Sequence, residues 1–216
     1  MLCVSLGEMD VANAARMAVH HELVEFRLDS IVLHDARDIP RLFSSHPNAI
    51  ATCRPGTRLD RAATLLEAIQ AGARFVDVER ESDPAFLAHI RTVAREYGCT
   101  LIVSHHDFEG TPSQAQLEDI REDCWRLGAD ICKIATFCRT AGDALRLLML
   151  LEREANRTVA VGMGCQGAIT RVAALPLGSP FTLAAPDEHQ GTAPGQLSLS
   201  QMENILKLMG YAAYAD

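Results

Sequence analysis

The chain has 216 residues and a formal net charge of −8, from 20 basic and 28 acidic side chains. This length accommodates one domain of ordinary size or one compact α/β barrel. The hydrophobic content of 48% and the charged content of 22% are typical of a soluble globular protein. The acidic balance disfavours nucleic acid or an anionic membrane as the main partner. No apolar run reaches the roughly 18–20 residues of a membrane span.

Two features of the composition stand out. Two of the 20 basic residues are lysines, Lys133 and Lys207, which leaves 18 arginines. The seven cysteines are scattered without a C-x-x-C pair, a pattern that disfavours a disulfide framework or a structural zinc site. We expect most of them to be small core residues. The scattered cysteines indicate a reducing compartment, so we expect a cytoplasmic protein. The N-terminus lacks the basic stretch and apolar core of a signal peptide.

Eight short apolar runs alternate with amphipathic segments along the chain. The runs are rich in Val, Ile, Thr and Phe, as buried strands are, and they comprise residues 2–6, 23–28, 48–54, 75–79, 100–106, 131–136, 158–164 and 179–185. Apolar residues at i, i+3 and i+4 predict helices within 10–21, 59–73, 83–98, 113–129 and 140–156 and, most weakly, near 38–45. Helix N-caps are predicted at Asp10, Asp83 and Ser113, and C-terminal glycines at Gly72, Gly98 and Gly128.

Regular alternation of strands and helices predicts parallel strands joined by right-handed crossovers. Eight such units predict a (β/α)8 TIM barrel that forms a single α/β domain over residues 1–216, near the short end for this fold. A doubly wound open sheet is the alternative. That fold usually carries a glycine-rich fingerprint after its first strand. This chain has only one glycine there, in Gly7-Glu8-Met9-Asp10, which disfavours the alternative.

Polar residues gather near the ends of the second to sixth predicted strands, where a barrel carries its function. Glu25, Arg27 and Asp29 alternate with apolar residues and therefore share one face. Arg54 ends the third run, Asp77 and Glu79 share one face at the end of the fourth, and Ser104 and His106 share one face at the end of the fifth. Lys133 lies inside the sixth run. Burying charges is costly unless they pair or serve a function. We therefore interpret these residues together as a functional site.

Lys133 lies inside the apolar run ICKIAT. Desolvation and nearby arginines would lower its pKa, and a partly neutral lysine is a nucleophile that forms imines with ketones. The alternative is a buried ion pair of Lys133 with Glu79 or Glu25. Lys207 lies in an amphipathic final segment and is expected at the surface.

His106 is the best acid–base candidate of the eight histidines, because imidazole exchanges protons near pH 7. Its neighbour His105 points to the opposite face and is expected to be structural. Glu79, one strand away, is placed to hold His106 in one tautomer.

Glycine-rich stretches follow the last two predicted strands, at 162–171 and 185–197. Such loops often bind phosphate in barrels, and the second has the composition of a mobile lid. Arg171, early in the helix after the seventh strand, is a candidate clamp for an anion such as a carboxylate. The residues alone thus predict an imine-forming lyase or aldolase with an anionic, hydroxylated substrate.

Several segments in order along nearly the whole chain carry a closer resemblance. They are ELVEFRLD (22–29), ATCRPG (51–56), FVDVE (75–79), SHHDFEGTPS (104–113), GADICKIAT (128–136), GMGCQGAITR (162–171) and GTAPGQ (191–196). With them the chain resembles the type I 3-dehydroquinate dehydratases, a family of class I aldolase-like (β/α)8 barrels. The HDF-x-x-TPS and GAD-x-x-KIA stretches are the most specific.

The resemblance implies a role for each site residue. Lys133 would form a Schiff base with the C3 ketone of 3-dehydroquinate, and the imine would acidify the adjacent C2–H. His106 would remove that proton and then protonate the departing C1 hydroxyl, while Glu79 orients His106 and tunes its pKa. The implied substrate-binding residues are Arg171 for the carboxylate, Thr192 and Gln196 from the lid, and Glu25, Arg27 and Arg54 for the ring hydroxyls.

The implied product is 3-dehydroshikimate, formed by syn elimination in the shikimate route to aromatic amino acids, without a metal or organic cofactor. The resemblance also implies a homodimer that binds a small-molecule substrate, and neither nucleic acid nor a membrane is expected as a partner. One alternative is a Schiff-base aldolase acting on a phosphorylated sugar acid, which the glycine-rich stretch after the seventh strand favours. Another is a non-catalytic barrel that binds a small carboxylate, although both Lys133 and His106 are present.

Overall fold

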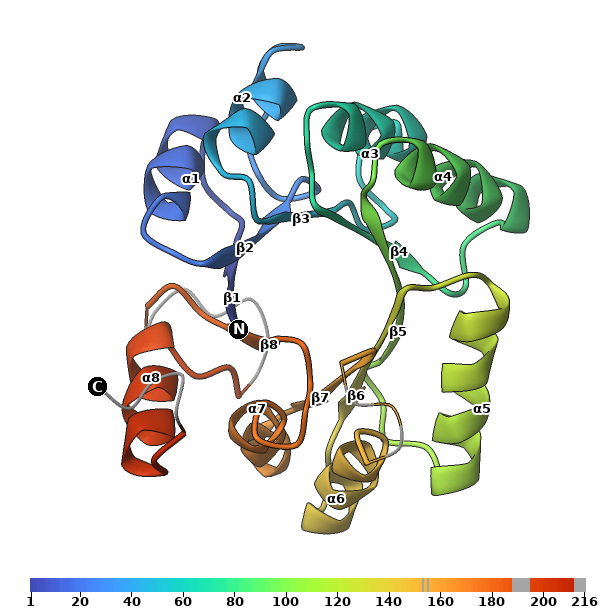
Figure 1. The fold of residues 1–216 in the computed structure, drawn as a ribbon, viewed down its shortest axis with the longest axis vertical. Coiled ribbons are helices and arrows are strands. Elements are labelled where there is room, and N and C mark those ends of the chain that lie inside the picture. Colours follow the sequence, from blue (N-terminus) through green and yellow to red (C-terminus); the bar gives the residue numbers. More distant parts are fainter. Residues whose placement is uncertain (153, 155, 188–194, 212–216) are drawn as a thin grey trace. The chain divides into compact units, whose positions relative to one another are not determined.

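The computed structural model describes residues 1–152, 154, 156–187 and 195–211, and Figure 1 shows strands and helices alternating along the chain. The strands are β1 (Leu2–Leu6), β2 (Leu23–Arg27), β3 (Ala49–Thr52), β4 (Phe75–Glu79), β5 (Thr100–Asp107), β6 (Ile131–Phe137), β7 (Thr158–Met163) and β8 (Thr182–Ala184). The α-helices are α1 (Val11–Ala18), α2 (Asp38–Ser45), α3 (Arg61–Gln70), α4 (Pro84–Glu96), α5 (Gln114–Arg126), α6 (Ala141–Met149), α7 (Ala168–Ala173) and α8 (Leu199–Leu208). A short 3-10 turn, Cys165–Gly167, precedes α7.

The predicted strands and helices are present in the predicted order, and several of them are shorter than predicted. The helix near 38–45 had the weakest sequence pattern, yet α2 forms there and buries Ile39, Leu42 and Phe43. The predicted eighth strand is longer than the observed β8, which begins after Pro180. Proline has no amide hydrogen to donate to a sheet, so a strand is not expected to extend through this position.

The predicted helix signals are also confirmed. The side chains of Asp10 and Asp83 accept hydrogen bonds from the first-turn amides of α1 and α4. Ser113 Oγ accepts one from the amide of Gln116 at 3.4 Å, at the start of α5. Glycines in the left-handed region end three helices, with φ of 103° at Gly72, 68° at Gly98 and 92° at Gly128, where a side chain would be strained.

The chain divides into two compact units. The β2–β5 unit consists of Ser5–Ser104 and Asp123–Ile131, and the β6–β8 unit consists of Met1–Val4, His105–Glu122 and the chain from Cys132 onward.

In the β2–β5 unit the strands pair in parallel in the order of the chain, with Glu25 beside Ile50, Thr52 beside Asp77, and Glu79 beside Ser104. Figure 1 shows α3 and α4 on the same side of β3 and β4. The apolar alternate residues of β2 are fully buried, and Phe26 makes an edge contact with Phe43 of α2 at a centroid distance of 5.3 Å. Because strand side chains alternate, Glu25 and Arg27 point to the opposite side of the sheet.

In the β6–β8 unit, β6 pairs in parallel with β7, and residues Leu2–Val4 of β1 pair in parallel with β8. Pairing of the first strand with the last is typical of a (β/α)8 sheet. Leu2 packs in one apolar cluster with Val172 of α7, with Leu175, which follows α7, and with Met202 and Leu206 of α8.

Across the described residues, no helix combines the length and hydrophobicity needed to cross a membrane.

Candidate active site

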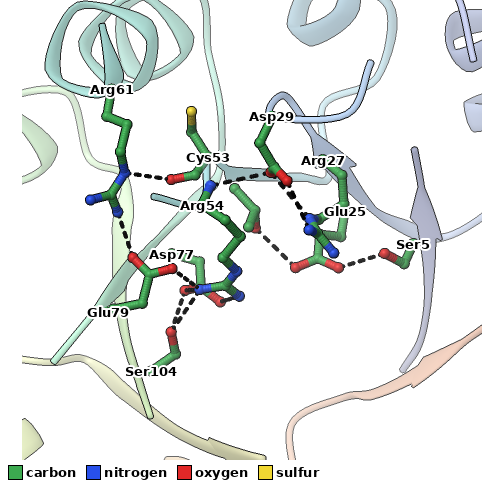
Figure 2. A network of polar contacts seen from close by, with 11 residues as sticks. Ser5, Glu25, Arg27, Asp29, Cys53, Arg54, Arg61, Asp77, Glu79 and Ser104 are labelled. Carbon is green, nitrogen blue, oxygen red and sulfur yellow. Dashed lines mark hydrogen bonds and ion pairs between the residues drawn. The ribbon is translucent and has the colours of Figure 1, made fainter. Parts of the chain in front are cut away.

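A network of polar contacts lies at the carboxyl ends of the strands in the β2–β5 unit (Figure 2). Glu25 is 3% exposed, and its carboxylate accepts hydrogen bonds from Ser5 Oγ at 2.6 Å and from Thr52 Oγ1 at 2.9 Å. The hydroxyls come from the strands on either side of β2 in the sequence, β1 and β3. Each Glu25 oxygen therefore has a donor in the protein itself, which offsets part of the cost of burying the carboxylate.

Arg27 and Asp29 form a two-pronged ion pair, with Nε and Nη2 of the arginine at 3.2 and 2.8 Å from the two carboxylate oxygens. Burial opposes the Arg27 charge, but Asp29 and Glu25 outweigh it and raise the Arg27 pKa. Asp29 Oδ1 also accepts a hydrogen bond from the backbone amide of Arg54 at 3.2 Å. This ion pair therefore connects the end of β2 to the segment that follows β3.

The guanidinium of Arg54 is the centre of the network. Its Nη1 lies 3.1 Å from Asp77 Oδ1, 2.7 Å from Glu79 Oε1 and 3.2 Å from Ser104 Oγ, and its Nη2 lies 3.3 Å from Asp77 Oδ2. Burial opposes the Arg54 charge, but Asp77, Glu79 and Glu25 outweigh it and raise the Arg54 pKa above its ordinary value. Arg54 is thus held in one place and stays charged.

Glu79 binds two arginines at once. Its Oε1 contacts Arg54, and its Oε2 accepts a hydrogen bond from Arg61 Nη2 at 2.5 Å. Sequence reasoning did not single out Arg61, because a basic residue at the start of an amphipathic helix resembles an ordinary surface residue. The network also includes Asp29 and Asp77, which the alternation pattern placed at strand ends but to which no role was assigned.

Lys133 lies in the β6–β8 unit and is 2% exposed. All residues of β6 from Ile131 to Thr136 are buried, and the lysine stands opposite Val159 of β7. Because strand side chains alternate, the Lys133 side chain projects from one face of β6 and those of Cys132 and Ile134 project from the opposite face. The prediction that this lysine is buried within a central strand is confirmed.

His106 lies near the end of β5 and is half-buried. Its ring stacks on that of Phe108, with centroids 6.3 Å apart and an interplanar angle of 17°, and Phe108 itself is 69% exposed. The loop after β5 is tied to the end of β6, since Thr111 Oγ1 lies 2.7 Å from Thr136 Oγ1 and donates to the Phe137 carbonyl at 3.0 Å. These contacts hold the loop that follows His106.

Arg171 of α7 is 1% exposed, the most deeply buried arginine of the predicted site. Its Nη1 donates to the carbonyl of Leu183 in β8 at 3.0 Å, and its Nε is buried without a hydrogen-bond partner. Burial lowers the pKa of Arg171 to about 10, so it remains charged at neutral pH. Within the described residues no carboxylate pairs with it, and a buried cation of this kind is suited to binding an anion.

A close backbone contact sets the position of α7. A Cβ at Gly167 would lie 2.4 Å from the carbonyl carbon of Gly162, so only glycine allows the turn to approach β7 this closely. The amide of Gly162 donates to Thr170 Oγ1 at 2.7 Å, and that hydroxyl donates to the Gly167 carbonyl at 2.8 Å. The residue after Thr170 is Arg171, which is therefore fixed relative to the end of β7.

Two predicted residues belong to the glycine-rich stretch after β8. Thr192 lies outside the described residues, whereas Gln196 is described and partly buried. Gly195 has φ of 74°, and a Cβ there would lie 2.5 Å from the Gly164 carbonyl oxygen. Gly195 therefore lies close to the backbone of Gly164, directly after β7. In the described ranges no three His, Cys, Asp or Glu side chains gather in a way that would hold a metal ion.

Eight β–α units, parallel strand pairs and polar side chains at the carboxyl ends of the strands define the class of the protein as a (β/α)8 barrel enzyme. Residues 2–213 match the family described as type I 3-dehydroquinase. The chain is 36% identical to a 3-dehydroquinate dehydratase of Desulfotalea psychrophila, over 94% of this chain and 96% of that one. It is 35% identical to one of Methanococcus maripaludis, over 97% of this chain and 100% of that one.

A solved structure of 3-dehydroquinate dehydratase from Geobacillus kaustophilus is similar throughout. It has a TM-score of 0.84 and 27% identity, and the match covers 98% of this chain and 91% of that chain. The chain belongs to the type I 3-dehydroquinase family. The resemblance predicted from the sequence motifs and the predicted (β/α)8 fold are both confirmed.

Proposed function

We propose that this chain is a 3-dehydroquinate dehydratase that eliminates water from 3-dehydroquinate to give 3-dehydroshikimate in the shikimate pathway. The observation that carries the proposal is the burial of Lys133 in β6, in a chain that belongs to the type I family. Burial disfavours the charged ammonium relative to the neutral amine. Lys133 can therefore attack the C3 ketone and, with loss of water, form the imine that serves as an electron sink.

His106 is the proposed acid–base group. In this mechanism it removes the C2 proton that the imine has acidified, and it then delivers a proton to the C1 hydroxyl, which leaves as water. Water then hydrolyses the product imine with the help of His106, which releases 3-dehydroshikimate and restores the Lys133 amine. Its half-buried position beside an exposed Phe108 is compatible with access to a substrate. Glu79 is proposed to orient His106 in addition to its contacts with Arg54 and Arg61, since a carboxylate has about four sites that accept hydrogen bonds.

The substrate is a hydroxylated ring that carries one carboxylate. Arg171 is proposed to bind that carboxylate, supported by its buried guanidinium and its unpartnered Nε. The ring hydroxyls are assigned to the network at the carboxyl ends of β2–β4, through Glu25, Arg27 and Arg54. Thr192 and Gln196 are proposed to cover the bound substrate.

Further parts of the proposal concern the whole protein. We infer a single catalytic domain over residues 1–216 that acts as a homodimer in the cytoplasm without a metal or organic cofactor. The alternative of an aldolase for a phosphorylated sugar acid is not favoured, because the family match spans residues 2–213.

A turnover assay with purified protein tests the proposed function. The wild type should convert 3-dehydroquinate to a conjugated enone, which is followed by its ultraviolet absorbance. Lys133→Met should abolish conversion, and His106→Gln should reduce kcat by about 10²–10⁴-fold, as expected for loss of an acid–base group. Folding of each variant is checked by circular dichroism. Conversion that survives in folded Lys133→Met would contradict the proposal.

A further inference from the structure

Arg61 makes three contacts from the first turn of α3. Its Nη2 binds Glu79 Oε2 at 2.5 Å, its Nε donates to the backbone carbonyl of Cys53 at 2.8 Å, and its guanidinium carbon lies 5.1 Å from the ring centroid of Phe86 in α4. The side chain is 20% exposed. Phe86 covers one face of the guanidinium, which favours the observed orientation over others. An arginine on a helix is thus fixed against the ends of two strands.

The contact with Cys53 fixes the backbone that carries Arg54. The Cys53 carbonyl and the Arg54 amide belong to one peptide unit, and Arg61 binds its oxygen while Asp29 Oδ1 binds its N–H at 3.2 Å (Figure 2). Because the peptide unit is planar, a donor at one end and an acceptor at the other fix its orientation. Arg54 therefore leaves the end of β3 in a set direction.

The contact with Glu79 balances charge around the Arg54 side chain. Arg54 contacts two carboxylates, Asp77 and Glu79, and one guanidinium neutralises one of them. Arg61 neutralises the other through the second oxygen of Glu79. Without Arg61, the group of Arg54, Asp77 and Glu79 would have a net charge of −1 at the place where an anionic substrate is proposed to bind. Glu79 would keep its contact with Arg54 but lose the contact made by its other oxygen.

We propose that Arg61 is a positioning residue for substrate binding, which holds Arg54 through the Cys53–Arg54 peptide and through Glu79 and removes the surplus negative charge. This inference rests on the proposed function, since it assigns Arg61 to the substrate site of the dehydratase. Arg54 is proposed to bind the substrate in the ground state and the transition state alike, so loss of its positioning raises KM more than it lowers kcat.

Steady-state kinetics of three variants test the inference, at a temperature well below the melting transition of each. In Arg61→Gln, KM for 3-dehydroquinate should rise by about tenfold to a hundredfold, as loss of one charge-assisted hydrogen bond implies, and kcat should change less. Arg61→Lys keeps the charge but lacks the planar fork that binds two acceptors, so its KM should be intermediate. The matched control is Arg58→Gln, which removes an exposed arginine from the same connection and should retain the wild-type KM.

The outcomes separate this inference from the proposed function. A wild type that does not convert 3-dehydroquinate overturns both. An active wild type with the same KM in folded Arg61→Gln overturns the inference alone, as does an equal rise of KM in Arg58→Gln. If Arg61→Gln does not fold, Arg61→Lys decides: a raised KM supports the inference, and a wild-type KM overturns it.

Discussion

Replacement of Arg171 by methionine should weaken substrate binding and stabilise the fold at the same time. The structure gives the direction of both changes, in stability and in substrate binding. Arg171 is 1% exposed, and burial alone lowers its pKa from the ordinary arginine value to about 10. At neutral pH the group is charged in both the folded and unfolded states, so this difference is a cost of about 3 kcal/mol to folding, at about 1.4 kcal/mol per pKa unit. Methionine fills a similar length of side chain without that charge.

Part of the gain is lost with the hydrogen bond to Leu183. The bond from Nη1 at 3.0 Å is absent in Arg171→Met, which leaves a buried carbonyl without this donor at a cost of about 1 kcal/mol. The net stabilisation is therefore about 2 kcal/mol. For a chain of this size, that raises the melting temperature by about 4–8 °C.

Binding should change in the opposite direction. A guanidinium that binds a carboxylate contributes about 1.5–3 kcal/mol through charge-assisted hydrogen bonds, so KM for 3-dehydroquinate should rise by about 10–150-fold. Arg171→Lys keeps the positive charge but lacks the planar guanidinium that binds two carboxylate oxygens. Its KM should therefore lie between those of the wild type and Arg171→Met. Calorimetry and steady-state kinetics measure both effects. A lower melting temperature with an unchanged KM would refute the reasoning that Arg171 is a desolvated cation that binds the substrate.

Two other predictions concern groups outside the proposed site. Burial lowers the pKa of His21, helped by His20 and His46, and burial also lowers the pKa of His46. The unfolded chain therefore binds more protons below about pH 6.5, and the melting temperature should fall as pH drops from 7.5 to 5.5. The melting temperature of His46→Gln should depend less on pH, and that of a variant at the exposed His89 should depend on pH as in the wild type. An equal pH dependence of the melting temperature in the wild type and both variants would contradict the assignment of this effect to His46. Six cysteines are buried and Cys165 is exposed, so brief treatment with a maleimide should add one label per native chain, seen by intact mass, and none in Cys165→Ser. Rapid labelling of Cys165→Ser would show that a buried thiol is accessible.

Period-two alternation predicted which strand side chains lie together. Asp77 and Glu79 were assigned to one face of β4 from their spacing alone, and both contact Arg54. Ser104 was assigned to one face of β5 together with His106, and its hydroxyl donates to Asp77 at 2.6 Å. The alternation is a property of the extended backbone and does not depend on the neighbours, so one sequence was enough.

Contacts made by long side chains were not predictable in this way. Arg61 begins a helix after the capping residue Asp60, and nothing local distinguishes it from a surface arginine. Its contacts with Glu79 and Cys53 depend on how α3 packs beside the strands. Likewise, α2 has a weak sequence pattern and forms because Ile39, Leu42 and Phe43 are buried in tertiary packing, which overrides local propensity.

The residues proposed for chemistry were predictable for a compositional reason. The chain has 18 arginines and two lysines, and one of these lysines, Lys133, lies inside a buried strand. An arginine at this position would stay charged and could not form an imine, so the presence of a lysine there indicates a chemical role. The substrate itself could be named only through the family motifs, because burial and spacing specify an imine-forming site and an anion but no particular ring.

Trapping the imine tests the central claim most directly. The protein is mixed with 3-dehydroquinate, reduced with borohydride and weighed by mass spectrometry, and the adduct is located by peptide mapping. The chain offers its own control, since Lys133 and Lys207 are its only lysines. The adduct should be on Lys133, persist in Lys207→Met and be absent from Lys133→Met. Full turnover without a trapped adduct, or an adduct on Lys207, would contradict the assignment of Lys133 as the imine-forming residue.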